Sequence, residues 1–241
     1  MKAIGWLVVT LLLVPCFYTC AQEPGLNTDL CLKYRVRNPA GQNPVKKVLI
    51  LLHGYGSNES DLLGLGASLP ADWAIITPRA PMEVGQGGYM WYTMNKDNGH
   101  HSGVKADLDR SRDLVLKFIA EVSTKYHLRA SQVYLGGFSQ GAMMSYYVGL
   151  SHPDAVAGIA PLSGMIIEKL KPELHLDKAK HGLRIFIGHG DMDERIELRE
   201  DKESEAYLRA GGLTPSFHAY TGMGHSISRE EVQDLAAWLP K

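Results

Sequence analysis

The sequence has no excess of either charge, because 25 Lys and Arg residues nearly balance 26 Asp and Glu residues and leave a formal net charge of -1. No stretch of the chain concentrates basic residues with aromatic residues between them. Proteins that bind nucleic acid usually carry such a basic surface. We therefore expect no nucleic-acid partner.

The sequence also lacks an apolar run of about 20 residues, the length that a membrane-spanning helix requires. The apolar run near the N-terminus, residues 6–14, is roughly half that length and lies between Lys2 and Pro15. This layout is typical of a secretory signal peptide, here residues 1–21 with cleavage after Ala21. The alternative is a lipoprotein anchored at Cys20. We expect a secreted or periplasmic protein whose mature chain has no membrane span.

Cysteine is scarce, with three residues in the whole chain. Cleavage after Ala21 would remove Cys16 and Cys20 and leave Cys31 alone. A single cysteine cannot form an internal disulfide. We expect Cys31 to be a half-buried strand residue without a chemical role.

What is present is the composition of an ordinary folded domain, with 45% hydrophobic and 21% charged residues. A length of 241 residues suits a single domain with a substantial core. Residues 22–44 read as an N-terminal segment with a short edge strand at 32–36 and a turn at 39–44. Residues 45–241 read as the main domain.

Strands of the main domain are indicated by apolar stretches without alternation, as expected where both faces of a parallel sheet are covered. These stretches are residues 46–52, 73–77, 133–136, 156–160 and 183–187. Segments with helical periodicity separate them, most clearly residues 104–126. The alternation predicts an α/β fold with a mostly parallel central sheet and helices on both faces. Such sheets place their functional sites at the carboxyl ends of the strands.

The most specific motif follows one of these strands. It is Gly137-Phe138-Ser139-Gln140-Gly141, which lies between the strand at 133–136 and a helix-compatible segment at 142–150. This is the nucleophile-elbow pattern of α/β-hydrolases. Ser139 would lie on a tight, strained turn, and side chains at the two glycine positions would collide with neighbouring backbone. We predict that Ser139 is a nucleophile and that the backbone N–H of Gln140 donates to the oxyanion.

A serine nucleophile requires a histidine base and an acid, which follow it in the order Ser, Asp, His in this fold. His225 lies on a glycine-flanked loop after the strand-like residues 216–220. Asp191 and Asp193 lie on the loop after the strand at 183–187. Both carboxylates are on the same short loop, so the residues alone leave the choice of acid open.

The other histidines have simpler interpretations. Four lie at helix ends or in polar connections and read as surface residues: His127, His152, His175 and His181. His218 lies within a strand. The pair His100-His101 has no further ligand cluster near it in sequence, so we expect neither a metal nor any other cofactor.

Four segments resemble the phospholipase/carboxylesterase family, to which acyl-protein thioesterases belong. They are residues 52–62, 136–142, 189–193 and 222–225, and the similarity extends over residues 45–239. The resemblance implies the α/β-hydrolase fold, with Asp193 as the acid and the backbone N–H of Tyr55 as the second oxyanion donor. In the family the acid is often followed by an apolar Val-Pro-type stretch, where this chain has residues 194–197, Glu-Arg-Ile-Glu. In the same family segment as Tyr55, His53 is expected to brace the loop by hydrogen bonding.

Residues 87–92 resemble a family segment that carries an aromatic residue near the acyl site. We therefore predict that Trp91 lines the substrate pocket, with simple packing of Trp91 as the alternative. Four methionines that flank the motifs are predicted to contribute to an adaptable apolar lining, with core packing as the alternative: Met143, Met144, Met165 and Met223. The chain is too short for a large lid domain, and an open, shallow site suits small esters and short acyl chains.

Together these features predict a serine hydrolase that cleaves small-molecule carboxylic esters through an acyl-enzyme on Ser139. Thioesters and lysophospholipids are further candidate substrates. Two alternatives stay open. One is a catalytically inactive hydrolase fold that only binds, and the other is an acyltransferase that uses the same residues. The oligomeric state is not indicated by the sequence.

Overall fold

The computed structural model describes residues 25–41, 44–97 and 99–240. A central sheet has the strand order β1-β3-β2-β8-β9-β10-β11. Its strands are β1 (Tyr34–Arg37), β2 (Val48–Leu52), β3 (Ala74–Pro78), β8 (Val133–Phe138), β9 (Gly158–Leu162), β10 (Arg184–Gly190) and β11 (Ser216–Tyr220). Strand β1 pairs antiparallel with β3 at the edge, and all other pairings in this sheet are parallel. The predicted mostly parallel sheet with an edge strand near the N-terminus is confirmed.

Three inner strands are buried along their whole length, since every residue of β2, β3 and β9 is buried. Continuous apolar runs form these strands because both faces of the sheet are covered. Most strand boundaries differ from the sequence prediction by one to three residues. Strand β9 begins at Gly158 and not at Val156, because the 3-10 turn η3 (Pro153–Ala155) delays the entry of the chain into the sheet.

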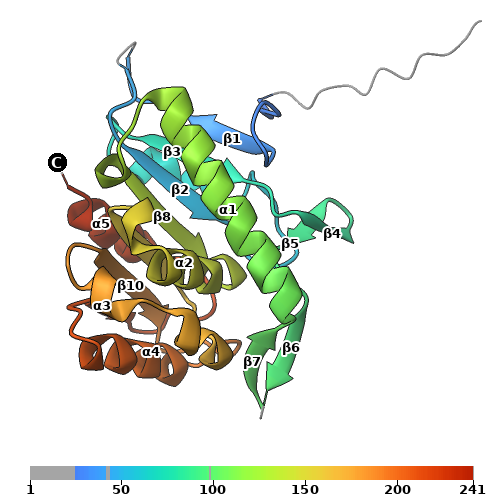
Figure 1. Cartoon of the computed structure of the whole chain (residues 1–241), viewed down its shortest axis with the longest axis vertical. Coiled ribbons are helices and arrows are strands. Elements are labelled where there is room, and N and C mark those ends of the chain that lie inside the picture. Colours follow the sequence, from blue (N-terminus) through green and yellow to red (C-terminus); the bar gives the residue numbers. More distant parts are fainter. Residues whose placement is uncertain (1–24, 42–43, 98, 241) are drawn as a thin grey trace, which may run out of the picture.

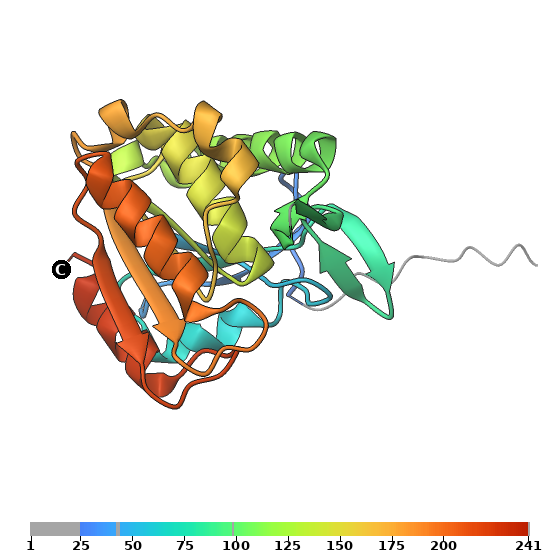
Figure 2. The ribbon, with the colours of Figure 1, turned by 90° about the horizontal axis from the view of Figure 1, so that it is seen from below.

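Helices cover both faces of the sheet, as predicted (Figure 2). On one face lie α1 (Lys105–Tyr126), α2 (Gln140–Ser151), α3 (Leu176–Ala179) and α4 (Leu198–Ala210). On the other lie η1 (Leu62–Ser68) and α5 (Arg229–Trp238). The buried side chains accordingly form two separate hydrophobic clusters. The face of α1 expected to be apolar is buried, from Leu108 to Val122.

Two short hairpins between β3 and α1 were not predicted. They are β4 (Met82–Gly85) with β5 (Gly88–Met90), and β6 (Met94–Asp97) with β7 (His100–Gly103), both antiparallel. Figure 1 shows both hairpins beside the sheet, near the N-terminal end of helix α1. All four residues of β6 are exposed, so no apolar pattern marks this strand in the sequence.

The N-terminal part of the structure corrects the prediction for Cys31. This residue is half-buried but lies in a bend before β1 and not in a strand. Its N–H donates to Glu121 Oε2 on α1 at 2.7 Å. Burial, together with Glu121, raises the pKa of the thiol to about 11. The predicted signal peptide, residues 1–21, lies outside the described residues.

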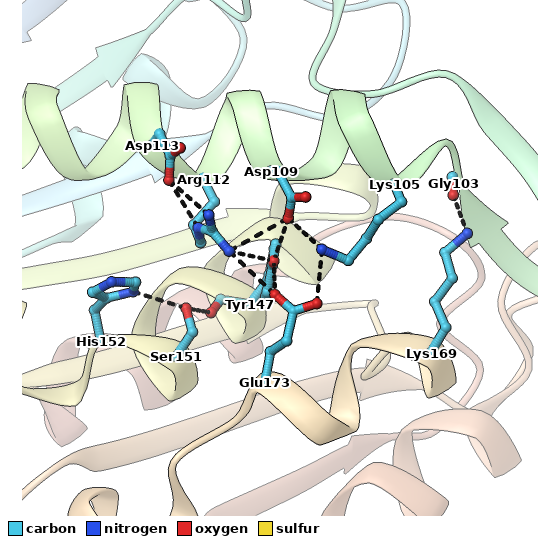
Figure 3. A network of polar contacts seen from close by, with 10 residues as sticks. All are labelled: Gly103, Lys105, Asp109, Arg112, Asp113, Tyr147, Ser151, His152, Lys169 and Glu173. Atoms are coloured by element: carbon cyan, nitrogen blue, oxygen red, sulfur yellow. Dashed lines mark hydrogen bonds and ion pairs between the residues drawn. The ribbon is translucent and has the colours of Figure 1, made fainter.

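A polar network ties α1 to α2 and to the 3-10 segment η4 (Glu168–Glu173), as Figure 3 shows. Tyr147 on α2 donates to Asp109 of α1 and is also 2.6 Å from Glu173 of η4. Lys105 completes the link, with its Nζ 2.6 Å from Asp109 and 2.7 Å from Glu173. Lys169 donates to the carbonyl of Gly103 at the end of β7, which attaches the second hairpin to this layer.

Candidate active site

The turn that holds Ser139 joins β8 directly to α2. Ser139 has φ 55 and ψ -115, a left-handed conformation that residues with side chains rarely adopt. A Cβ at Gly137 would lie 2.5 Å from the carbonyl carbon of Gly141, and one at Gly141 would lie 2.1 Å from Leu52 O. Only glycine fits at either position, which is the steric requirement expected of the motif. The turn presents the Ser139 hydroxyl above the carboxyl end of β8.

His225 lies beside this hydroxyl, on the loop between β11 and α5. Its Nε2 is 2.9 Å from Ser139 Oγ, and its Nδ1 is 2.7 Å from Asp193 Oδ2. The imidazole also packs on Phe138, with ring centroids 4.8 Å apart. Three side chains that are distant in sequence therefore form one hydrogen-bonded line.

Asp193 is held on both of its oxygens. Its Oδ1 accepts the backbone N–H groups of Arg195 at 2.9 Å and Ile196 at 3.0 Å, while Oδ2 faces His225. Burial alone would raise the pKa of this carboxyl, but these hydrogen bonds outweigh burial and hold its pKa below the ordinary value. Because backbone groups hold Oδ1, the unusual Glu-Arg-Ile-Glu sequence after Asp193 does not disturb it.

Asp191 has a different environment. It is exposed, and its Oδ1 accepts the backbone N–H of Gly222 at 2.7 Å. Asp191 thus fixes the turn that leads into the His225 loop. Of the two neighbouring aspartates between which the sequence left the choice open, Asp193 is the one hydrogen-bonded to His225.

Tyr55 and Gln140 line the same cavity as Ser139. The Tyr55 side chain is 50% exposed, whereas that of Gln140 is buried. Among the described residues, neither backbone N–H has a hydrogen-bond acceptor. Both N–H groups are therefore available to a bound molecule.

His53 is buried and braces the loop of Tyr55, as expected. Its Nε2 is 3.1 Å from the backbone nitrogen of Ala80, which can only donate. Nδ1 must therefore carry the ring proton, and it lies 2.8 Å from the carbonyl of Gly54. Burial lowers the pKa of His53, so the ring stays neutral. His53 holds the loop by two hydrogen bonds of fixed direction.

The cavity beside Ser139 has a volume of about 570 Å³. Its lining combines the loop residues already described with apolar side chains from the hairpins and helices. These apolar residues are Tyr92, Met94, Phe138, Met143 and Ile196. Charged or polar lining comes from Asp61, His101, Ser102 and Arg195. A volume of this size is in the range of small-molecule sites.

Trp91 and Met165, two of the predicted pocket residues, do not line this cavity. Trp91 is fully buried, and its Nε1 donates to the carbonyl of His53 at 2.9 Å. Met165 is 5% exposed and packs in the core on the helical face. The prediction that Trp91 and Met165 contact the substrate is therefore corrected. The neighbouring Tyr92 lies in the wall, and so does Met143, another of the methionines proposed from the sequence as lining.

The remaining histidines divide as expected, with one exception. The four that were read as surface residues are all exposed: His127, His152, His175 and His181. The exception is His189, which is fully buried and lies 3.5 Å from Asp193 Oδ2. Sequence reasoning gave His189 no role, although its place in the motif beside Asp193 could have drawn attention to it. Within residues 25–41, 44–97 and 99–240, no three His, Cys, Asp or Glu side chains gather in a way that could hold a metal ion.

Comparison with known proteins gives the same family over nearly the whole described chain. A family model described as Phospholipase/Carboxylesterase matches residues 35–241. Acyl-protein thioesterase 1 of Debaryomyces hansenii is 30% identical over 217 residues, which is 83% of this chain and 92% of that protein. Acyl-protein thioesterase 1 of Mycosarcoma maydis is 28% identical over 232 residues, covering 87% of this chain and 97% of that protein.

Solved structures share the fold. Esterase PE8 superposes with a TM-score of 0.70 at 27% identity, covering 84% of this chain and 95% of its own. A carboxylesterase from Mesorhizobium loti superposes with a TM-score of 0.75 at 21% identity, covering 88% and 96%. The predicted α/β-hydrolase fold is confirmed.

The predicted secreted or periplasmic location is wrong. Curated relatives that match most of this chain are named acyl-protein thioesterases, and the comparisons support neither export nor a lipoprotein anchored at Cys20. An apolar run of about ten residues is shared by signal peptides and by core segments of folded proteins, so its length did not decide the question. No helix in the described part of the chain has the length and apolar character needed to cross a membrane.

Three findings indicate the same family: the match to the family model, the full-length similarity to acyl-protein thioesterases and the shared fold. Relatives named as thioesterases and carboxylesterases act on ester-type bonds. This chain belongs to the phospholipase/carboxylesterase family of α/β-hydrolases and is an ester hydrolase.

Proposed function

We propose that this enzyme cleaves small carboxylic esters and thioesters through an acyl-enzyme formed on Ser139. The observation that carries the proposal is the line of hydrogen bonds from Ser139 Oγ to His225 Nε2, at 2.9 Å, and from His225 Nδ1 to Asp193 Oδ2, at 2.7 Å. A serine hydroxyl becomes a useful nucleophile when an adjacent imidazole accepts its proton. These distances are within the range for such a transfer.

In the first half of the reaction, Ser139 Oγ attacks the substrate carbonyl carbon as its proton passes to His225 Nε2. The imidazolium that forms is stabilised by the ionised Asp193, which also fixes the Nδ1–H tautomer. Negative charge develops on the carbonyl oxygen. The backbone N–H groups of Tyr55 and Gln140 are the donors we assign to it, and each such donor can contribute about 3 kcal/mol.

The intermediate then collapses as His225 returns the proton to the leaving alcohol or thiol. The acyl group stays on Ser139. Water enters, His225 takes a proton from it, and attack of the water oxygen on the acyl carbon releases a carboxylic acid and restores Ser139. The same three side chains serve both halves.

The lining of the cavity supports an acyl group of limited size as the substrate moiety. Apolar walls from Tyr92, Phe138, Met143 and Ile196 suit a hydrocarbon chain. Relatives whose names state acyl-protein thioesterase activity support thioesters beside oxygen esters. Lysophospholipids remain candidates because they carry a single acyl ester.

The test is hydrolysis of p-nitrophenyl butyrate and of S-butyrylthiocholine by the full chain. We expect Ser139→Ala to lose activity on both substrates by about 10³-fold or more. The matched control is Ser145→Ala, a buried serine on the same helix whose hydroxyl donates to Ala142 O. We expect this control to keep its activity. Labelling by a fluorophosphonate should modify the Ser139 peptide, and turnover in a folded Ser139→Ala protein would overturn the assignment.

A further inference from the structure

His189 is a fully buried titratable side chain for which the proposed reaction gives no task. It lies at the carboxyl end of β10. Its Nδ1 is 2.9 Å from Asp201 Oδ2, and its Nε2 is 2.9 Å from the carbonyl oxygen of Ile196. The same Nε2 is 3.5 Å from Asp193 Oδ2. The ring therefore lies between a carboxylate on α4 and the carboxylate that faces His225.

The hydrogen-bond partners determine where the protons of this ring lie. A carbonyl oxygen can only accept, so Nε2 carries a proton that it donates to Ile196. Nδ1 faces Asp201, and the other oxygen of Asp201 accepts the Tyr146 hydroxyl at 2.7 Å. A second proton must lie between Nδ1 and Asp201 Oδ2, because a bare lone pair on Nδ1 would face a buried anion.

The second proton keeps this pair neutral overall, because burial raises the pKa of Asp201 and disfavours an unpaired carboxylate. We assign that proton to Nδ1, which makes His189 an imidazolium. Asp201 is fully buried, and an uncompensated carboxylate in that position would cost several kcal/mol. Burial alone would lower the pKa of His189, but its hydrogen bond and charge contact with Asp201 outweigh burial and raise it. In this form a positive charge lies 3.5 Å from Asp193 Oδ2, the oxygen that also faces His225.

We propose that His189 is a positioning residue of this enzyme: as a buried imidazolium held by Asp201, it orients the Asp193 carboxylate and keeps it ionised. The inference rests on the proposed roles of Ser139, Asp193 and His225. It assigns a task to His189 and Asp201, which touch neither substrate nor reacting atoms.

His189 orients the Asp193 carboxylate through the backbone of Ile196. Ile196 donates its N–H to Asp193 Oδ1 at 3.0 Å and offers its carbonyl to His189 Nε2 at 2.9 Å. Ile196 is itself buried, so neither contact is replaced by water. His189 thus fixes the backbone segment that in turn fixes Asp193.

The charge of His189 also acts on Asp193 directly, because His189 Nε2 lies 3.5 Å from Asp193 Oδ2. A positive charge there favours the ionised form of Asp193, the form that accepts the hydrogen bond of His225. Removing the charge should move the acid limb of the pH–rate profile to higher pH.

The other titratable groups around His189 do not cancel this effect near neutral pH. Glu231 on α5 has both carboxylate oxygens buried without a hydrogen-bond partner among the described residues, and burial raises its pKa to about 8. Glu231 is therefore mostly protonated at pH 7. Tyr146 on α2 is fully buried and neutral, because burial raises its pKa well above the ordinary value. Glu205, the other charged group that influences Asp201, lies on the same helix α4.

The experiment compares pH profiles of kcat/KM for p-nitrophenyl butyrate in two variants that remove the charge differently. Asp201→Asn keeps the Tyr146 contact and can donate to Nδ1 of a neutral His189, so every hydrogen bond has a replacement. His189→Gln keeps an N–H directed toward Ile196 but carries no charge. We expect both to raise the acid-limb midpoint by about 0.5 pH unit and to lower kcat more than they change KM.

Glu231→Gln is the matched control, because it is an isosteric change in the same buried cluster at a group that is uncharged below pH 7. Its acid limb should coincide with that of the wild type. A folded Asp201→Asn or His189→Gln protein whose acid limb is unchanged, or moves to lower pH, overturns the role of His189. The Ser139→Ala result stands apart, since activity in that variant would contradict the proposed nucleophile whatever these profiles show.

Discussion

The side-chain carbonyl of Gln140 accepts the backbone N–H of Trp91 at 2.7 Å, although 49 residues separate the two. The amide nitrogen of Gln140 donates to the carbonyl of Tyr92 at 2.8 Å. Trp91 in turn donates from its ring to His53 O at 2.9 Å. The residue after Ser139 is thereby connected, through one buried tryptophan, to the loop that carries Tyr55.

Gln140→Ala should break this connection and leave the backbone groups of Trp91 and Tyr92 unpaired in a buried place. Each unsatisfied buried group costs about 1–3 kcal/mol. We expect the free energy of unfolding to fall by about 2 kcal/mol and kcat/KM for p-nitrophenyl butyrate to fall as well, measured by urea denaturation and steady-state kinetics. Gln132→Ala serves as the control and should cost less, because the two hydrogen bonds that it removes, to Lys46 O and from the Arg129 N–H, are exposed. Equal stability of the two variants would contradict the role given to Gln140.

Substitutions of the two aspartates on the loop after β10 should have very different effects on kcat. Asp193→Asn removes the negative charge beside His225 and favours the wrong tautomer, so kcat should fall by about 10³-fold to 10⁴-fold. Asp191→Asn only alters the contact with the N–H of Gly222, so its kcat should stay within about tenfold of the wild type. Both are measured with p-nitrophenyl butyrate at pH 7.5. A larger loss in the Asp191 variant would reverse the assignment of the acid.

Acyl preference should respond to the exposed methionine in the cavity wall. Met94 is 49% exposed and lines the cavity, whereas Met192 is 64% exposed and does not. Met94→Ser removes apolar surface that a longer acyl chain can cover, worth about 1 kcal/mol. We expect kcat/KM for p-nitrophenyl octanoate to fall about fivefold more than that for the acetate. Met192→Ser should leave the ratio of the two rates unchanged, and an identical response of both variants would exclude Met94 from the acyl site.

Stability should depend on pH through Glu231. Burial raises the pKa of this carboxyl from its ordinary value of 4.5 to about 8 in the folded enzyme. Below pH 4.5 the group is protonated in both states and has no effect, whereas above pH 8 the folded protein bears the full cost of a buried charge. Its contribution to stability is therefore lost as pH rises between these values.

The comparison of wild type with Glu231→Gln measures this effect. We expect the variant to gain up to about 3–5 kcal/mol relative to the wild type between pH 5 and pH 9, as measured by urea denaturation. Gly188 makes room for the carboxyl, since a Cβ there would lie 2.2 Å from Glu231 Oε1. Gly188→Ala should therefore destabilise the protein at every pH. A constant difference between Glu231→Gln and the wild type across this range would show that Glu231 does not titrate as described.

The sequence predicted the local features well because they depend on a few consecutive residues. The steric demand at Gly137 and Gly141 is visible in the motif itself, and buried parallel strands are visible as unbroken apolar runs. The hairpin β6–β7 was missed because its first strand is exposed and has no apolar pattern. The hydrophobic character of Trp91 was equally consistent with a pocket wall and with the core, and the structure places it in the core.

The sequence by itself determined the kind of turn that holds Ser139, the order of the candidate acid and base along the chain, and the parallel sheet that brings strand ends together. Only the tertiary structure decided which carboxylate faces His225, because Asp191 and Asp193 differ in the direction of their side chains and not in local composition. It also decided that His189 lies beside Asp193, 3.5 Å from the oxygen that faces His225. That arrangement depends on α4, which brings Asp201 to the buried end of β10, and no spacing within the chain encodes such a contact.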